Sequence, residues 1–233
     1  MRVSAQRSDL VEAAHVLSRL NLVTAYGHVS VRAGASILIT PAADLATVTE
    51  STIVEVPLEV AELPAAAPAE AWAHLAIYRA RPDADSIARA QPASTFAAAA
   101  THTSLPPLYG QAAWLGESVP VYDSAHLLRS AHLAERAARS LPTGEALMLR
   151  GNGALTIGAT PGVAVARMWL LSAACEACLA ARAAGQVRPL TSEEIASWRA
   201  VGDELLPRLW QYLRHHRAGE SSEMGEPRET IPA

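Results

Sequence analysis

The stretch ALMLRGNGALTIG, at residues 146–158, places two apolar runs on either side of a short turn. The first run, Ala146–Arg150, predicts a strand, and the second, Ala154–Gly158, predicts a strand that returns beside it. The turn between them reads Gly-Asn-Gly, and both residue types tolerate a positive φ. We therefore expect two neighbouring strands of a sheet, joined by a tight turn.

The rest of the chain mixes further strands with helices. Apolar periodicity and turn residues predict helices at Ser8–Leu20, Glu70–Ala80, Ser94–Ala100, Ser124–Ser140, Gly162–Ala184 and Ser192–Arg217. The same signals predict strands at Tyr26–Val31, Ser36–Thr40, Ile53–Pro57, Ser86–Arg89 and Val119–Tyr122. Strands and helices do not alternate strictly, so we expect an α/β fold with a mixed or antiparallel sheet and helices on its faces.

Length and composition indicate one globular domain over residues 1–217. The chain has 233 residues, of which 50% are hydrophobic and 18% are charged, as in a soluble protein with a full core. Residues 218–233 are charged and rich in Pro, Gly and Ser, and we expect them to be disordered. The formal net charge of −4 argues against nucleic acid or an anionic membrane as a partner. The N-terminus lacks an apolar signal core, so the expected location is the cytoplasm.

All 19 basic residues are arginine, and lysine does not occur in the sequence. Schiff-base catalysis and an internal aldimine with pyridoxal phosphate both need an amine that a lysine side chain would supply. A phosphate-binding P-loop also needs a lysine. The composition therefore excludes these kinds of lysine chemistry.

The two cysteines, Cys175 and Cys178, indicate a reducing compartment rather than a disulfide framework. They stand in an alanine-rich run that predicts a helix, and no second cysteine pair is present for a zinc site. We expect both to be small core residues.

Five short motifs occur in order along the chain. They are GHVSVR at Gly27–Arg32, LITP at Leu38–Pro41, Glu70 followed by HLAIY at His74–Tyr78, RPD at Arg81–Asp83, and LRGNG at Leu149–Gly153. In this order and spacing, the chain resembles the class II aldolase/adducin family from about Ser8 to about Trp198. The resemblance implies an α/β/α sandwich around a mostly antiparallel sheet, with helices on both faces, and usually a tetramer with active sites between subunits.

The resemblance also implies a site built around a divalent metal, and here the chain departs from the family pattern. Family members usually hold zinc with three histidines and place an acid/base Glu at the start of a helix. That Glu corresponds to Glu70, whereas the histidine positions fall on Arg89, Gln91 and Asn152. Arginine is always cationic and amide oxygens are weak ligands, so we expect no metal at these positions.

An arginine at the metal position can bind the oxyanion that a metal would have bound. We therefore expect Arg89 to supply positive charge, and Gln91 and Asn152 to orient the substrate. Two alternatives stay open. One is that the histidines were lost after the protein lost its activity. The other is that Arg89 forms a structural ion pair with Glu70 or Asp85.

The positions that bind phosphate in sugar-phosphate aldolases of the family are also altered. Two serine hydroxyls become Pro68 and Ala69, so a sugar phosphate is not the expected substrate. His28 replaces a family Asn and is expected to shuttle protons near neutral pH. The candidate catalytic residues are Glu70, His28 and Arg89, and the candidate substrate-binding residues are Gly27, Thr40, Gln91, Arg150, Asn152 and His102.

Three functions remain open from the sequence. The first is a lyase-type enzyme, without metal or other cofactor, that acts on a small unphosphorylated carboxylic or aromatic acid through an enolate or carbanion. Decarboxylation, aldol cleavage, dehydration and isomerisation all fit. The second is a metal-dependent lyase with a divalent metal such as zinc, held by relocated ligands among Glu70, His28, His74 and His102, although a structural role is favoured for His74. The third is a non-catalytic scaffold or ligand-binding protein. In each case we expect a small-molecule partner and a homo-oligomer, with a tetramer favoured.

Overall fold

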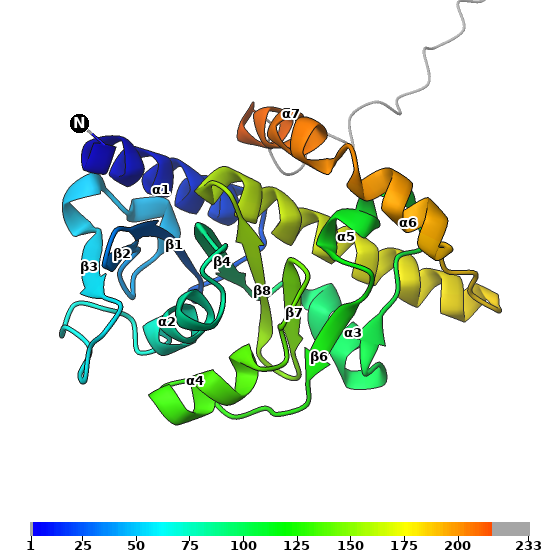
Figure 1. Ribbon diagram of the computed structural model, residues 1–233, viewed down its shortest axis with the longest axis horizontal. Coiled ribbons are helices and arrows are strands. Elements are labelled where there is room, and N and C mark those ends of the chain that lie inside the picture. The colour runs from blue at the N-terminus through cyan, green and yellow to red at the C-terminus, as the bar shows by residue number, and fades with distance from the viewer. Residues whose placement is uncertain (1, 216–233) are drawn as a thin grey trace, which may run out of the picture.

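The predicted strand pair lies in the middle of the sheet. A computed structural model describes residues 2–215, and in it β7 (Ala146–Leu149) and β8 (Gly153–Gly158) are antiparallel neighbours. They belong to one eight-stranded sheet with the order β3-β2-β1-β4-β8-β7-β6-β5 (Figure 1). The remaining strands are β1 (His28–Ala33), β2 (Ser36–Ile39), β3 (Val54–Pro57), β4 (Ser86–Ala90), β5 (Ser104–Leu105) and β6 (Val119–Tyr122).

Neighbouring strands of this sheet are antiparallel, with one exception. The pair β6 and β7 is parallel, so the sheet is mixed as well as mostly antiparallel. The predicted α/β class is confirmed.

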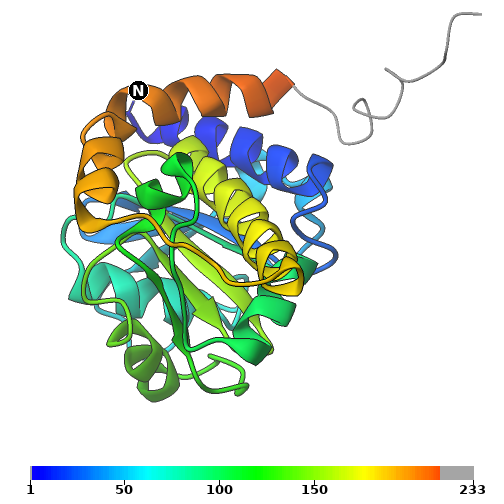
Figure 2. The same cartoon turned by 90° about the vertical axis from the view of Figure 1, so that its right-hand side faces the viewer.

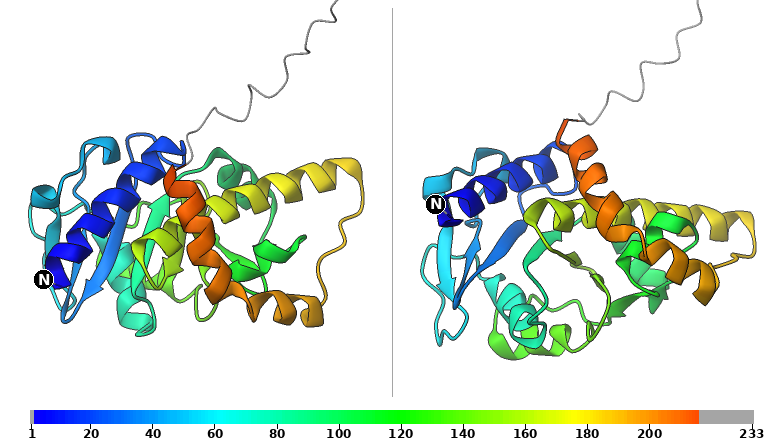
Figure 3. Two further views of the ribbon diagram at one scale, coloured as in Figure 1. Left: turned by 90° about the horizontal axis from the view of Figure 1, so that it is seen from above. Right: turned by 45° about the horizontal axis from the view of Figure 1, so that its top comes forward.

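Helices cover both faces of the sheet. One face carries α1 (Arg2–Arg19), α3 (Ala93–Thr101) and α5 (Pro161–Ala184), and the other carries α2 (Ala71–Ala80) and α4 (Ala131–Ala138) (Figures 1 and 2). Two last helices, α6 (Ser192–Arg199) and α7 (Gly202–His215), lie outside α5, and α7 crosses α5 and α1 in Figure 3. Short 3-10 turns stand at Leu45–Thr47, Glu50–Thr52 and Gly110–Leu115.

Strand β4 shows how the sequence divides between the two layers. Ala88 and Ala90 belong to the core beneath α5, whereas Ile87 belongs to the core beneath α2. Side chains alternate between the faces of a strand, so Arg89 shares the face of Ile87. A charged residue thus enters the layer between the sheet and α2.

The helix predicted at Ser124–Ser140 is shorter than expected. Only Ala131–Ala138 is α-helical, and the Ser130 hydroxyl caps its start by accepting a hydrogen bond from the Leu133 amide at 3.4 Å. The residues before Ser130 form a loop instead, and this loop contributes to the site described below.

The last predicted helix, Ser192–Arg217, is interrupted. Helix α6 ends at Arg199 and α7 begins at Gly202, and the carbonyl of Trp198 accepts a hydrogen bond from the Trp114 indole at 2.7 Å. A carbonyl bonded to another element at this point marks the end of α6. The prediction of a disordered tail concerns residues outside the described 2–215.

Helix α5 is the one described helix long and apolar enough to cross a membrane, but 61% of its most apolar window is buried inside the protein. It contacts β4, β8, α1, α3 and α7, which makes it the central helix of its layer. Cys175 and Cys178 are fully buried on it, so their prediction as core residues is confirmed. Burial raises the pKa of the Cys175 thiol to about 12.

Candidate functional site

A cavity of about 480 Å³ lies where β1 begins and β4 ends, beside the turn between β7 and β8. Six of the residues predicted from the sequence line it together. They are Gly27, His28, Glu70, Arg89, Gln91 and Asn152. These residues come from β1, β4, the start of α2 and the β7–β8 turn, so the fold brings distant segments to one place.

Arg89 is the central charge of this cavity. It lies opposite His28 in the β1–β4 register and is only 2% exposed. Its Nη2 donates a hydrogen bond to Asn152 Oδ1 at 2.7 Å, and Gln91 Nε2 donates to the same oxygen at 3.4 Å. Across residues 2–215, no carboxylate lies within the 4.0 Å of an ion pair with Arg89. The alternative that Arg89 pairs with Glu70 or Asp85 is therefore wrong.

The β7–β8 turn holds Asn152 in place through its two glycines. Gly151 has φ +70° and Gly153 has φ +80°, a region that favours glycine. A Cβ at Gly153 would lie 2.2 Å from the Ala90 carbonyl oxygen, so this turn touches the end of β4. Asn152 Nδ2 is buried and lacks a hydrogen-bond partner within the described chain.

Two buried imidazoles lie behind Arg89. His28 and His74 have ring centroids 6.0 Å apart, at a steep angle of 72°. The Ser30 hydroxyl lies 2.8 Å from His74 Nδ1 and 2.9 Å from the Tyr78 hydroxyl, which ties these side chains to the core. His28 Nδ1 and His74 Nε2 are buried without a partner among the described residues.

Burial fixes the charge state of these imidazoles. Desolvation, followed by the positive charge of Arg89, lowers the pKa of His28 to about 3. Desolvation also lowers the pKa of His74 well below its usual value. Both rings are neutral at pH 7. This low pKa does not favour His28 as a proton shuttle near neutral pH, and the role stays a prediction.

Glu70 has a partner that the sequence did not indicate. Its Oε1 accepts a hydrogen bond from Arg129 Nε at 2.9 Å, across the cavity wall. Burial alone would raise the pKa of the Glu70 carboxyl, but the hydrogen bond and charge of Arg129 and the charge of Arg89 outweigh it. The net shift lowers the pKa of Glu70, which is a carboxylate at neutral pH.

Sequence reasoning missed three large side chains of the cavity, all of them exposed. Tyr26 is 64% exposed, Leu127 is 50% exposed, and the Arg129 side chain is 55% exposed. Leu127 and Arg129 belong to the loop that had been predicted as helix. Ser130 is a good helix cap in sequence terms, and reading it as one would have placed this loop outside α4.

Three predicted substrate-binding residues do not line the cavity. The Thr40 hydroxyl accepts a hydrogen bond from the Val29 amide at 3.1 Å and is fully buried. Arg150 forms a surface ion pair with Asp123. His102 Nε2 lies 3.9 Å from the sulfur of Cys178 on α5, on the other face of the sheet. Each is occupied by contacts elsewhere in the fold.

The residues in the cavity do not fit a divalent metal. Within residues 2–215 no group of three or more His, Cys, Asp or Glu side chains is placed to hold one. Arg89 occupies the position that the family resemblance gives to an imidazole, and its fixed positive charge repels a cation. His28 and His74 lie close together, but Glu70 is bound to Arg129.

A family model described as the class II aldolase and adducin N-terminal domain matches residues 8–179. A Streptomyces roseochromogenus subsp. oscitans protein, 4-hydroxy-3-prenylphenylpyruvate oxygenase/4-hydroxy-3-prenylbenzoate synthase, is 31% identical over 121 residues. This match covers 52% of the chain but only 44% of that protein, so the chain spans less than half of its relative.

Solved structures show the same fold. The L-fuculose 1-phosphate aldolase of Glaciozyma antarctica PI12 matches with a TM-score of 0.76 and 22% identity, over 92% of this chain and 90% of that one. YgbL of Escherichia coli, provisionally described as an aldolase, epimerase or decarboxylase, matches with a TM-score of 0.75 and 19% identity, over 85% of this chain and 100% of that one. The family model spans most of the chain, and the chain therefore belongs to the class II aldolase and adducin family.

Proposed function

We propose that this protein is a lyase-type enzyme that binds a small unphosphorylated acid and stabilises its enolate or carbanion at Arg89, without a metal. One observation carries the proposal: a buried guanidinium has a neutral amide, and no carboxylate, as its partner in the described chain. Burying a charge without a partner of opposite charge costs free energy, so the cavity is suited to an anionic ligand.

The other cavity groups fit this chemistry. When a bond from hydrogen, a carboxylate carbon or another carbon to the carbon beside a carbonyl breaks, its electron pair forms a carbon–carbon double bond. The π pair of the carbonyl then moves onto the oxygen, and Arg89 stabilises the negative charge that develops there. Glu70 is a carboxylate at neutral pH and accepts the proton that leaves this carbon or a hydroxyl group beside it. The unpaired Asn152 Nδ2 and the neutral His28 ring are further groups that can orient oxygen atoms of the substrate.

Three observations favour an aromatic acid over a sugar phosphate. Tyr26 and Leu127 stand exposed in the lining and offer apolar surface to a ring. The cavity wall presents the methyl groups of Ala42 and Ala43, and among the described residues its lining contains no serine or threonine hydroxyl that could bind a phosphate. The name of the Streptomyces relative contains a phenylpyruvate and a benzoate, both aromatic acids.

Binding and metal content test this proposal together. We expect purified, untagged protein to bind phenylpyruvate or para-hydroxybenzoate, to ignore L-fuculose 1-phosphate, and to carry well below one equivalent of metal. Arg89→Gln should weaken binding of the acids by about 10²–10³-fold, without lowering the melting temperature. A stoichiometric metal that survives dialysis and whose removal ends turnover would contradict the metal-independent chemistry.

The proposal includes a homo-oligomer, with a tetramer favoured. Its support is the family membership, together with a largely apolar hollow of about 670 Å³ between α5 and α7, which a neighbouring subunit could cover. Light scattering at micromolar concentration tests it. A particle with the 24.6 kDa mass of one chain would contradict it.

A further inference from the structure

Arg129 is a second cation in the same cavity, and it differs from Arg89 in its exposure to solvent. It lies on the loop between β6 and α4, which residues 123–130 form. Leu128 anchors this loop, because it is 2% exposed in the core beneath α2 and α4. Leu127 and Arg129, on either side of Leu128, instead line the cavity with exposed side chains.

The charges of the cavity are unbalanced. Arg89 and Arg129 supply two positive charges, Glu70 supplies one negative charge, and the His28 ring is neutral. Within residues 2–215 the Glu70 carboxylate forms an ion pair with Arg129 alone, but its charge also acts on Arg89. One further negative charge would balance the cavity, which is the charge of a monocarboxylate.

The two arginines are not equally able to meet a carboxylate. Arg89 lies on the central strand β4, and its hydrogen bond to Asn152 fixes its position. A ligand oxygen must therefore come to Arg89, because the guanidinium does not move toward the ligand. The Arg129 side chain is 55% exposed, and only the Glu70 carboxylate holds it in the described structure. A second carboxylate can take the place of Glu70 on this guanidinium without moving the sheet.

We propose that Arg129 binds the carboxylate of the substrate in exchange for Glu70, while a second oxygen of the same molecule lies against Arg89. This inference rests on the function proposed above. It names the substrate class as an α-keto acid or a related acid with an oxygen next to its carboxylate. It also makes the activity of Glu70 as a base depend on substrate binding. The carboxylate of Glu70 becomes free to accept a proton only when the substrate occupies Arg129.

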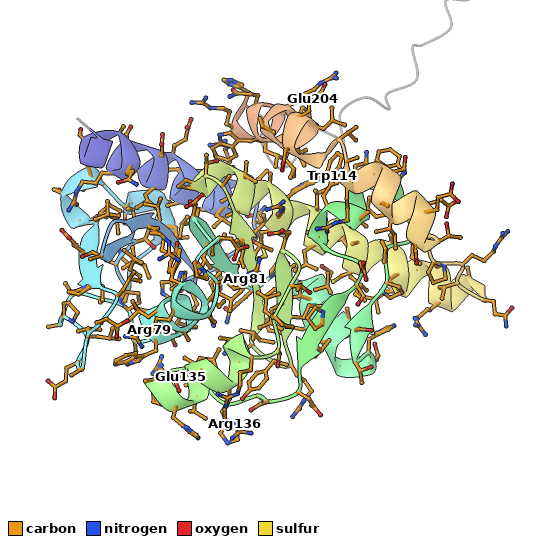
Figure 4. All side chains as sticks on the ribbon, in the orientation of Figure 1. Arg79, Arg81, Trp114, Glu135, Arg136 and Glu204 are labelled. Carbon is orange, nitrogen blue, oxygen red and sulfur yellow. The ribbon has the colours of Figure 1, made fainter. Side chains whose placement is uncertain are left out.

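A pair of probes that differ in one group tests the exchange. Phenylpyruvate has the carboxylate, and phenylacetone replaces this group with a methyl while keeping the ring and the carbonyl. Calorimetric titration of both into wild type, Arg129→Gln, Arg129→Lys, Glu70→Gln and Arg89→Gln measures each contact. Arg136→Gln is the matched control, because Arg136 is exposed on the outer side of α4, away from the cavity lining (Figure 4).

We expect Arg129→Gln to weaken phenylpyruvate binding at least about tenfold, or about 1.4 kcal/mol, and to leave phenylacetone binding unchanged. Arg129→Lys should fall between wild type and Arg129→Gln, because lysine keeps the charge without the planar fork. Glu70→Gln should tighten phenylpyruvate binding, since it removes the competing carboxylate. A purely structural Glu70–Arg129 pair predicts instead a lower melting temperature and unchanged affinities.

The outcomes separate this inference from the proposed function. If Arg129→Gln binds phenylpyruvate with wild-type affinity, the proposed role of Arg129 is overturned. The proposed function still stands in that case if Arg89→Gln has lost affinity for both probes. Wild-type affinity of Arg89→Gln for both probes overturns the proposed function. If wild type binds neither probe at millimolar concentration, both proposals fail.

Discussion

Arg32 and Arg89 stand on neighbouring strands and show two opposite uses of a guanidinium. Arg32 lies at the end of β1, and its Nε and Nη2 donate to the backbone carbonyls of Ala84, Tyr78 and Arg81 at 2.8–3.1 Å. It also stacks over the Tyr78 ring, 4.9 Å from the centroid. Arg89, at the opposite end of the same strand pair, has one amide oxygen as its partner in the described chain.

The difference is informative because the degree of burial alone would not show which of the two arginines has a structural role. Arg89 is the more buried of the two, yet it has the fewer partners. The hydrogen bonds of Arg32 close the end of α2 against the sheet, which is a structural task. The N–H donors of Arg89 that have no partner in the described chain indicate a role in binding a ligand. The number of satisfied donors, rather than burial, therefore separates the two roles.

The largest expected effect is on ligand binding. Arg89→Gln should lower affinity or turnover by about 10²–10³-fold, as for the loss of a group that stabilises an oxyanion. Its free energy of unfolding should stay the same or rise, because a buried charge without a carboxylate is removed. Chemical denaturation and a binding titration on one preparation check both points. A large loss of stability would give Arg89 the same role as Arg32.

The converse result is expected for Arg32. Arg32→Gln leaves three backbone carbonyls without their donor, and we expect a loss of about 3 kcal/mol in the free energy of unfolding. Urea denaturation measures it. Ligand affinity of the remaining folded protein should be unchanged, since Arg32 does not line the cavity. A change in affinity at constant stability would break the comparison.

The environment of Arg89 also predicts a pH effect on stability. The folded-state pKa of His28, about 3, is below its unfolded value of 6.5, so between these values only the unfolded state takes up the proton. Stability is then lost as pH falls from 6.5, by about 2 kcal/mol at pH 5. His74 acts in the same direction.

Denaturation curves between pH 8 and pH 5 measure this effect. His28→Asn should flatten the pH dependence, whereas His132→Gln, at an exposed position, should leave it as in wild type. Equal pH dependence in wild type and His28→Asn would show that the His28 imidazole is not held neutral beside Arg89.

The smallest expected effect concerns the apolar rim. Leu127→Ala removes apolar surface that would cover an aromatic ring, and we expect affinity for phenylpyruvate to fall about fivefold, or about 1 kcal/mol. Stability should hardly change, because Leu127 is 50% exposed. Acetate and pyruvate serve as control ligands without a ring. An equal loss for them would argue against a ring-binding role of this side chain.

Local patterns in the sequence predicted much of the fold. The apolar runs around Gly151–Gly153 predicted the β7–β8 pair because alternation and turn chemistry act over a few residues. The same alternation places Ile87 and Arg89 on one face of β4, and Gln91 follows directly after the strand ends at Ala90. The fold then brought Arg89 and Gln91 to the cavity together with Glu70 and Asn152.

The parts of the site that sequence reasoning missed depend on contacts between distant segments. The Glu70–Arg129 pair joins residues 59 positions apart, and no periodicity relates a helix start to a loop. The partners of Arg89 could not be counted from the sequence either. Low pKa values of imidazoles depend on burial beside a cation, which is a property of the packed layers.

The strand order has a consequence for how the cavity moves. Strand β4 is hydrogen-bonded to β1 on one side and β8 on the other, so Arg89 is carried by backbone that opens only with much of the protein. Arg129 lies on the loop of residues 123–130, outside the hydrogen-bonded strands, so we expect this loop to open without the sheet. Amide hydrogens around Arg89 should thus exchange on the timescale of global unfolding, and those of the loop by local opening. If the loop opens in this way, the cavity keeps the charge of Arg89 fixed while the segment that carries Arg129 admits and releases the ligand.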